Sequence, residues 1–127
     1  MSAITERKHT GEFIISEANG QRSRDEVTVT VANATTLEAG TVLGQLDATG
    51  KYVPYDNSGS DGSETAAGVL YDELVNEGVA PADFDGVVVN GDAEIRKADL
   101  KWAAGLVDAD KDAAYVDLAT VGIKARD

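Results

Sequence analysis

Several kinds of reactive side chain are scarce in this chain. Its 127 residues include no cysteine, one histidine, one tryptophan and two prolines. Without cysteine, the protein has no disulfides, thiol nucleophiles or thiolate metal sites. The one histidine, His9, has no carboxylate or nucleophile held beside it by the local sequence, so we expect no catalytic triad. The residue types present therefore do not favour an enzyme.

Long apolar runs and an excess of positive charge are missing too. No stretch of about 18 apolar residues is present, and no apolar block follows a basic start, so we expect neither a membrane helix nor a signal peptide. The net charge of −12 should repel phosphates, which makes nucleic acid an improbable direct partner. We expect a chain of this length to form one domain with a modest core. Oligomerisation would stabilise such a domain by burying additional surface.

The charge is distributed unevenly along the chain. Residues 1–24 hold four basic and three acidic side chains, a net charge of +1, which leaves −13 for residues 25–127. Residues 1–10 carry a single large aliphatic side chain apart from Met1, at Ile4, which is too little to offset the entropy of ordering. We therefore predict an extended arm over residues 1–24 and a single body domain over residues 25–127.

Strand signals dominate the body. Residues 27–31 (VTVTV) alternate apolar and polar side chains at period two, which is typical of a half-buried strand. Residues 41–46 and 52–55 flank a five-residue connection and predict a hairpin, with Pro54 at an edge or bulge. Residues 65–70 supply another strand. Residues 84–90 are nearly continuous in apolar side chains after Asp85, and we expect that strand at the centre of the fold, buried on both faces.

Helical signals are confined to the carboxyl-terminal third. Residues 98–104 predict one or two helical turns closed by Gly105. Asp108 is the expected amino-terminal cap of a second helix through Ala119, followed by a short closing strand over residues 121–124. The predicted fold class is α+β, with a β-rich body of short, mostly antiparallel strands, one or two small helices, and the extended amino-terminal arm.

The carboxylates form no recognisable metal or cofactor site. Residues 108–112 (DADKD) imitate the start of a calcium loop, but Ala113 stands where the turn needs glycine and Ala119 where a bidentate glutamate should close the site. Capping and helix-dipole complementarity explain these aspartates better. Residues 40–44 (GTVLG) lack the lysine that follows the glycines of a phosphate-binding loop. We predict no metal, no cofactor and no catalytic residue.

Three aromatic residues are candidates for contacts between molecules. Tyr52 and Tyr55 lie in the predicted hairpin, with Lys51 as the only basic neighbour, so a platform for single-stranded nucleic acid is weakly supported. Trp102, beside Leu100 and Leu106, is most simply a core residue. A subunit contact remains the alternative for all three aromatic residues.

A family resemblance rests on residues 39–44 (AGTVLG), 51–55 (KYVPY) and 61–70 (DGSETAAGVL), together with residues 11–18 (GEFIISEA). These segments resemble the head decoration proteins of lambda-type tailed phages. The resemblance implies a homotrimer that binds the major capsid protein at threefold positions on the outside of an expanded head. It also implies a location on the outer surface of the virion, after synthesis in the host cytoplasm, and stabilisation of the shell against DNA pressure.

The arm is the expected attachment device. Its strand-forming run, Phe13, Ile14 and Ile15, would pair with a sheet edge of the capsid protein, assisted by Arg22 and Arg24. The run would add little to its own domain. The competing hypothesis is a β-rich module displayed on a virion that recognises a surface glycan through Tyr52 and Tyr55.

Overall fold

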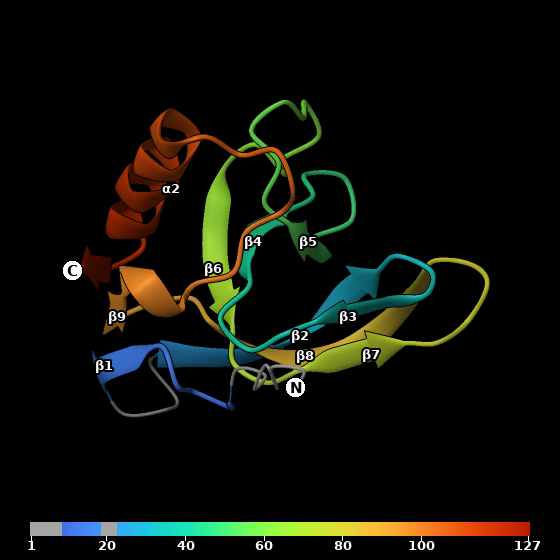
Figure 1. Ribbon diagram of the computed structural model, residues 1–127, viewed down its shortest axis with the longest axis horizontal. Coiled ribbons are helices and arrows are strands. Elements are labelled where there is room, and N and C mark those ends of the chain that lie inside the picture. Colours follow the sequence, from blue (N-terminus) through green and yellow to red (C-terminus); the bar gives the residue numbers. More distant parts are fainter. Residues whose placement is uncertain (1–8, 19–22) are drawn as a thin grey trace, which may run out of the picture.

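The computed structural model describes residues 9–18 and 23–127, and a closed barrel of five short strands forms its centre (Figure 1). The strands follow the order β2-β5-β4-β6-β8 around the barrel. All neighbours are antiparallel except β2 and β5, which form a single parallel pair. The barrel strands are β2 (Arg24–Val31), β4 (Val42–Gln45), β5 (Tyr52–Pro54), β6 (Ala66–Leu70) and β8 (Ala82–Val89).

The longest ladder of the barrel confirms the predicted period-two strand. All eight residues of β2 pair with β8, from Arg24 opposite Val89 to Val31 opposite Ala82. Val29 and Val31 are fully buried, whereas Thr28 and Thr30 are only half-buried. The hairpin predicted from residues 41–55 is also present, as β4 and β5.

A two-stranded ribbon extends from the barrel. β3 (Thr35–Leu37) pairs antiparallel with β7 (Leu74–Asn76). Figure 1 shows this ribbon running beside β2 and β8, so that the loop between β7 and β8 ends the projection on the right. Neither strand was predicted from the sequence.

A second sheet lies on the other side of the molecule. β9 (Ala93–Arg96) is its middle strand, between β1 (Ile14–Glu17), which is antiparallel to it, and β10 (Ile123–Arg126), which is parallel to it. The helix α2 (Asp108–Thr120) packs against β6 and β10, and a 3-10 turn, η1 (Lys97–Asp99), follows β9. Neither helix in the described residues is long and apolar enough to cross a bilayer.

Two apolar clusters hold these layers together. One fills the barrel and includes Val29, Leu43 and Val88. The other joins the barrel to α2 and to the β1-β9-β10 sheet, and it includes Phe13 and Leu118. Phe13 is only 1% exposed. The expectation that the strand-forming run of the arm adds little to its own domain is therefore wrong, because Phe13 is part of the core and β1 pairs with β9.

Several element boundaries differ from the predictions. The turns expected over residues 98–104 shrink to η1, although Gly105 does adopt a positive φ of 88°. β8 is buried on both faces only at its end, because residues 82–85 alternate between half-buried and exposed. The closing strand begins at Ile123 rather than at Val121. The barrel itself was not predicted, since closure depends on which strands meet and not on local pattern.

Candidate functional site

The predicted capsid-binding run divides between the interior and the surface. Phe13 points into the core, Ile14 is half-buried, and Ile15 is 42% exposed. Ile15 lies at a break in the register between Ile14, opposite Ile95, and Ser16, opposite Glu94. Such a bulge turns one extra side chain away from the ladder. Of the three residues, Ile15 is therefore the one available to a partner.

The outer edge of β1 is a second candidate for partner binding. β1 is the end strand of its sheet, and within the described residues no strand pairs with its outer edge. An edge strand presents unpaired backbone N–H and C=O groups to any strand that approaches it. The edge and the Ile15 side chain together form one surface, which we call the β1 edge.

An ion pair fixes β1 to β2. The Arg24 guanidinium donates to both carboxylate oxygens of Glu17, with a distance of 3.0 Å from Nε to Oε2. The buried Ser23 hydroxyl donates to the same Oε2 at 2.7 Å. The hydrogen bond from Arg24 holds the pKa of Glu17 below its ordinary value. The same pair raises the pKa of Arg24.

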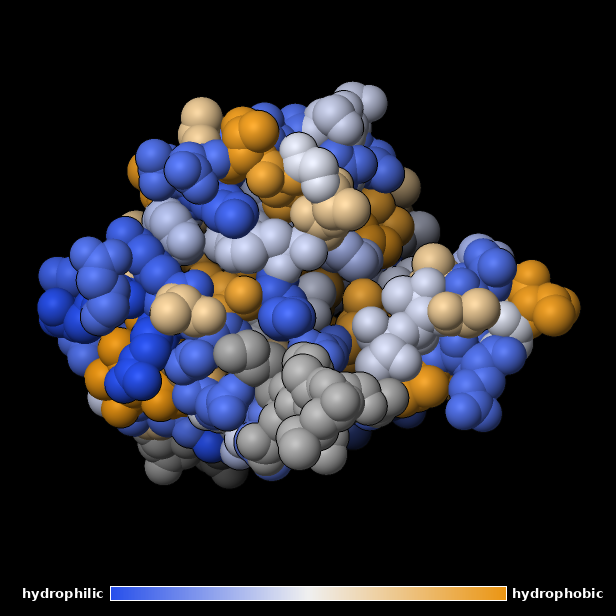
Figure 2. Space-filling model, viewed as in Figure 1, coloured by the Kyte–Doolittle hydropathy of each residue, from blue (hydrophilic) through white to orange (hydrophobic). Residues whose placement is uncertain are grey.

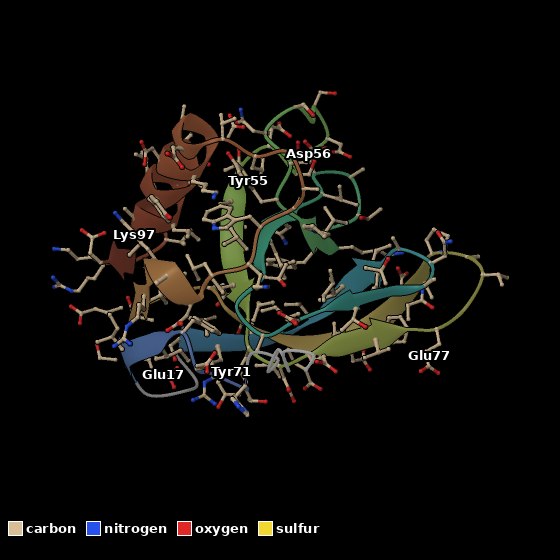
Figure 3. All side chains as sticks on the ribbon, viewed as in Figure 1. Glu17, Tyr55, Asp56, Tyr71, Glu77 and Lys97 are labelled. Carbon is tan, nitrogen blue, oxygen red and sulfur yellow. The ribbon has the colours of Figure 1, made fainter. Side chains whose placement is uncertain are left out.

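The Arg24 side chain is also stacked on an aromatic ring. Its guanidinium carbon lies 4.0 Å from the centroid of Tyr71, and Figure 3 labels Tyr71 and Glu17 on the same side of the molecule. This placement favours an anchoring role for Arg24 over a direct capsid contact. Arg22, the other predicted arginine, lies outside the described residues.

Further contacts fasten residues 9–13 to the body. The Gly11 amide donates to the Tyr71 carbonyl at 3.0 Å, and the Thr10 hydroxyl donates to Asp72 Oδ1 at 2.6 Å. The Arg96 amide donates to the Phe13 carbonyl at 2.8 Å. The described part of the arm is thus ordered on its own domain, and it leads directly into the β1 edge.

The hairpin tyrosines do not form an exposed platform. Tyr52 is 5% exposed and Tyr55 is 1% exposed, so they cannot stack on a glycan, and the glycan-binding hypothesis loses its proposed surface. The Tyr55 hydroxyl lies 3.0 Å from Asn57 Oδ1 and 3.2 Å from the Asp110 carbonyl. Burial raises the pKa of Tyr55, and nearby carboxylates, Asp117 first among them, add to the effect.

Trp102 stands between two other aromatic rings. It makes edge-on contacts with Tyr55 and Tyr115, with centroids 6.2 and 5.6 Å apart. Its side chain is only half-buried, because it also borders a surface groove of about 500 Å³. We call this the Trp102 groove. Its lining comes from β3 and its flank, β5 and the segment after η1: Thr35, Thr36, Leu37, Glu38, Thr41, Pro54, Lys101, Trp102 and Ala103.

The aspartates of the loop between β5 and β6 accept hydrogen bonds from serines of the same loop. Asp56 accepts hydrogen bonds from the amide and hydroxyl of Ser58, and Asp61 accepts the same pair from Ser63. The bonds from Ser63 lower the pKa of Asp61. Gly62 has a φ of 108°, and a Cβ there would collide with the Gln45 carbonyl oxygen, so the turn requires glycine.

The aspartates of residues 108–112 also have a structural role, at the start of α2. Helix α2 begins at Asp108, but the cap is Val107, whose amide donates to Asp110 Oδ2 at 3.2 Å. The prediction of Asp108 as the cap is therefore wrong: the cap is Val107, and Asp110 supplies the carboxylate that accepts its amide. Across residues 9–18 and 23–127, no group of three histidine, aspartate or glutamate side chains could hold a metal ion.

One family comparison finds a match to this chain. The family model described as bacteriophage lambda head decoration protein D matches residues 3–123. The match includes the β1 edge, the barrel, the ribbon and the Trp102 groove. No curated protein sequence matches the chain significantly.

Proposed function

The chain belongs to the family of bacteriophage lambda head decoration protein D, and from this membership we propose that it binds the outside of an expanded phage head at threefold positions. Membership makes it a capsid decoration protein, a structural component of the virion that binds the capsid. A structural family implies a role without catalysis. On this proposal the protein stabilises the shell against the pressure of packaged DNA by adding contacts between capsid subunits.

The single observation that best supports an attachment mechanism is the edge position of β1. A strand of the major capsid protein would pair with the outer edge of β1 and continue the β1-β9-β10 sheet, with Ile15 packed against an apolar pocket. Ordering a free arm would cost about 1 to 2 kcal/mol per residue in backbone entropy. Since β1 is already ordered on β9, this cost falls on folding and not on binding.

Threefold symmetry multiplies this contact. A homotrimer presents three β1 edges to the shell, and once one has bound, the other two bind as intramolecular events. The charge of the chain suits an exterior site, because a net charge of −12 is repelled by packaged DNA. We therefore propose a trimer on the outer surface, in contact with capsid protein and without contact to nucleic acid.

Cosedimentation with heads tests this function. We expect the protein to pellet with expanded heads that lack decoration protein and to remain in the supernatant with unexpanded heads. Decorated heads should retain their DNA at temperatures at which bare heads release it. Equal loss of DNA from bare and fully decorated heads would contradict the stabilising role, and failure to pellet with expanded heads would contradict capsid binding.

A further inference from the structure

The far end of the ribbon presents an apolar loop to solvent. Residues 78–82 (GVAPA), which we call the ribbon tip, follow β7 and contain no charged side chain. Val79 is 97% exposed. Figure 2 shows an apolar patch at this end of the molecule, and Figure 3 labels the adjacent Glu77 there. Single exposed apolar residues are common, so the tip needs further evidence before a role is assigned to it.

A buried asparagine holds the ribbon tip in shape. The Asn76 amide nitrogen donates to the carbonyls of Val31 and Ala80, both at 3.0 Å, and its oxygen accepts from the Gly78 amide at 2.9 Å. The Gly78 carbonyl accepts from the Ala34 amide at 3.1 Å. The tip is therefore preorganised, so docking it costs little conformational entropy. Its most exposed side chain is held away from its own domain.

The lining of the Trp102 groove includes a strand edge that could receive a polypeptide segment. Four consecutive residues of the lining, 35–38, come from β3 and its flank. Because side chains alternate between the two faces of a strand, consecutive residues line a groove only where it follows the strand's edge. Among the described residues, β3 pairs with β7 alone, so its other edge keeps backbone groups available to a guest. A volume of about 500 Å³ is typical of a binding pocket.

The tip and the groove are also matched in charge. Among the residues that the structure describes, two charged side chains line the groove, Glu38 and Lys101, and they pair with each other at 3.3 Å. Both surfaces are thus close to neutral in a chain whose net charge is −12. Two copies of so acidic a chain repel each other over most of their surfaces, and neutral apolar patches are where they can approach closely.

We propose that the ribbon tip of one copy docks into the Trp102 groove of a second copy, with Val79 packed against Trp102 and Pro54. This inference rests on the proposed homotrimer and names its interface. The tip and the groove are different surfaces of the chain, so the contact is head to tail, and such a contact closes into a ring when the rotation between copies permits. The tip alone is smaller than the roughly 800 Å² that each partner buries in a stable interface. The tip is the buried centre of the interface, and the flanking residues of the ribbon add to the area that the interface buries.

The first test compares two charged substitutions at exposed valines. Val79→Asp places a charge in the groove, whereas Val116→Asp makes the same change on the outer face of α2, where Val116 is 66% exposed. Both variants should fold like the wild type, as judged by circular dichroism. We expect Val79→Asp to raise the protein concentration needed for half-assembly at least about tenfold, measured by light scattering, with no such change for Val116→Asp.

The second test works even if copies associate only on the head. Because the chain has no cysteine, Val79→Cys combined with Ala103→Cys creates the only two thiols. A short, flexible bis-maleimide should convert head-bound protein into covalent trimers on a denaturing gel. The matched control, Val79→Cys combined with Val116→Cys, should give no trimers.

The outcomes separate this interface from the proposed function. Trimers that form normally with Val79→Asp, or that do not crosslink through Ala103→Cys, would overturn the interface and leave capsid decoration intact. Protein that decorates heads as isolated monomers would overturn both the interface and the proposed trimer. Loss of decoration by wild-type protein in cosedimentation would instead count against the proposed function.

Discussion

The barrel and the β1-β9-β10 sheet are built from the chain in different ways. The barrel contains a local hairpin, β4-β5, beside the β2-β8 ladder between distant segments, whereas the second sheet brings together residues 14–17, 93–96 and 123–126. The barrel is closed, but the second sheet is open, with β1 and β10 as its end strands. A closed barrel supplies a stable frame, and an open sheet supplies a place for another strand. On our proposal, the barrel supplies the stable frame and the β1 edge of the second sheet binds the capsid.

The largest loss of stability is expected from removing the side chain that joins the two regions. Phe13→Ala should lower the free energy of unfolding by about 3 to 5 kcal/mol, because Phe13 lies in the cluster shared by the barrel, α2 and the second sheet. Ile15→Ala, two residues further along at the bulged and exposed position, should change it by less than about 0.5 kcal/mol. Denaturant unfolding at a fixed protein concentration measures both. Equal small effects would mean that the amino-terminal segment is not part of the core.

The ion pair between β1 and β2 should have a smaller, pH-dependent effect. Glu17→Gln should cost about 1 to 2 kcal/mol at pH 7, because it removes a charge-assisted hydrogen bond to Arg24. The pKa of Glu17 is lowered in the folded protein, so the stabilisation is complete above the ordinary glutamate pKa of 4.5 and is lost as the pH falls through the lower folded value.

Unfolding curves at several pH values check that sign. The difference between wild type and Glu17→Gln should be largest near neutral pH and should shrink towards zero as the pH falls well below 4.5. A difference that stays constant down to acidic pH would show that the pair contributes through packing and not through charge.

The start of α2 offers the smallest effect. Asp110→Ala should cost about 1 kcal/mol, because Asp110 accepts from the Val107 amide and from the Asn57 side chain at 2.8 Å. Asp108→Ala should cost less, since Asp108 lies in the first turn and adds its charge at the positive end of the helix dipole. Thermal unfolding of the two variants ranks them, and a larger loss for Asp108→Ala would contradict the observed cap.

Elements with local signals could be predicted from the sequence, whereas contacts between distant segments could not. Period-two alternation in β2 and the turn residues between β4 and β5 are local signals, and both elements are present. The burial of Phe13 could not be read locally, because its run is isolated by glycines and its partner strand, β9, lies about 80 residues later in the chain. Strand pairing between segments so far apart leaves no pattern in the local sequence.

The candidate binding surfaces were likewise predictable only where they depend on local sequence. Phe13, Ile14 and Ile15 were identified as a strand, but only the register break in β1 shows that Ile15 is the exposed member. The Trp102 groove is assembled from β3, β5 and residues 101–103, which are separate in sequence, and the ribbon tip carries no residue type that signals binding. From the sequence, only the absence of charge in residues 78–82 sets the ribbon tip apart, and the exposure of Val79 comes from the structure.

Binding of Ile15→Asp to expanded heads tests the central claim, that the β1 edge attaches the protein to the capsid. The residue is exposed, so the variant should unfold like the wild type, and Val116→Asp provides a matched control on α2. We predict that Ile15→Asp weakens cosedimentation with expanded heads at least about tenfold, because it places a charge in the extended sheet, and that Val116→Asp binds normally. Equal binding of Ile15→Asp, Val116→Asp and the wild type would contradict attachment through the β1 edge.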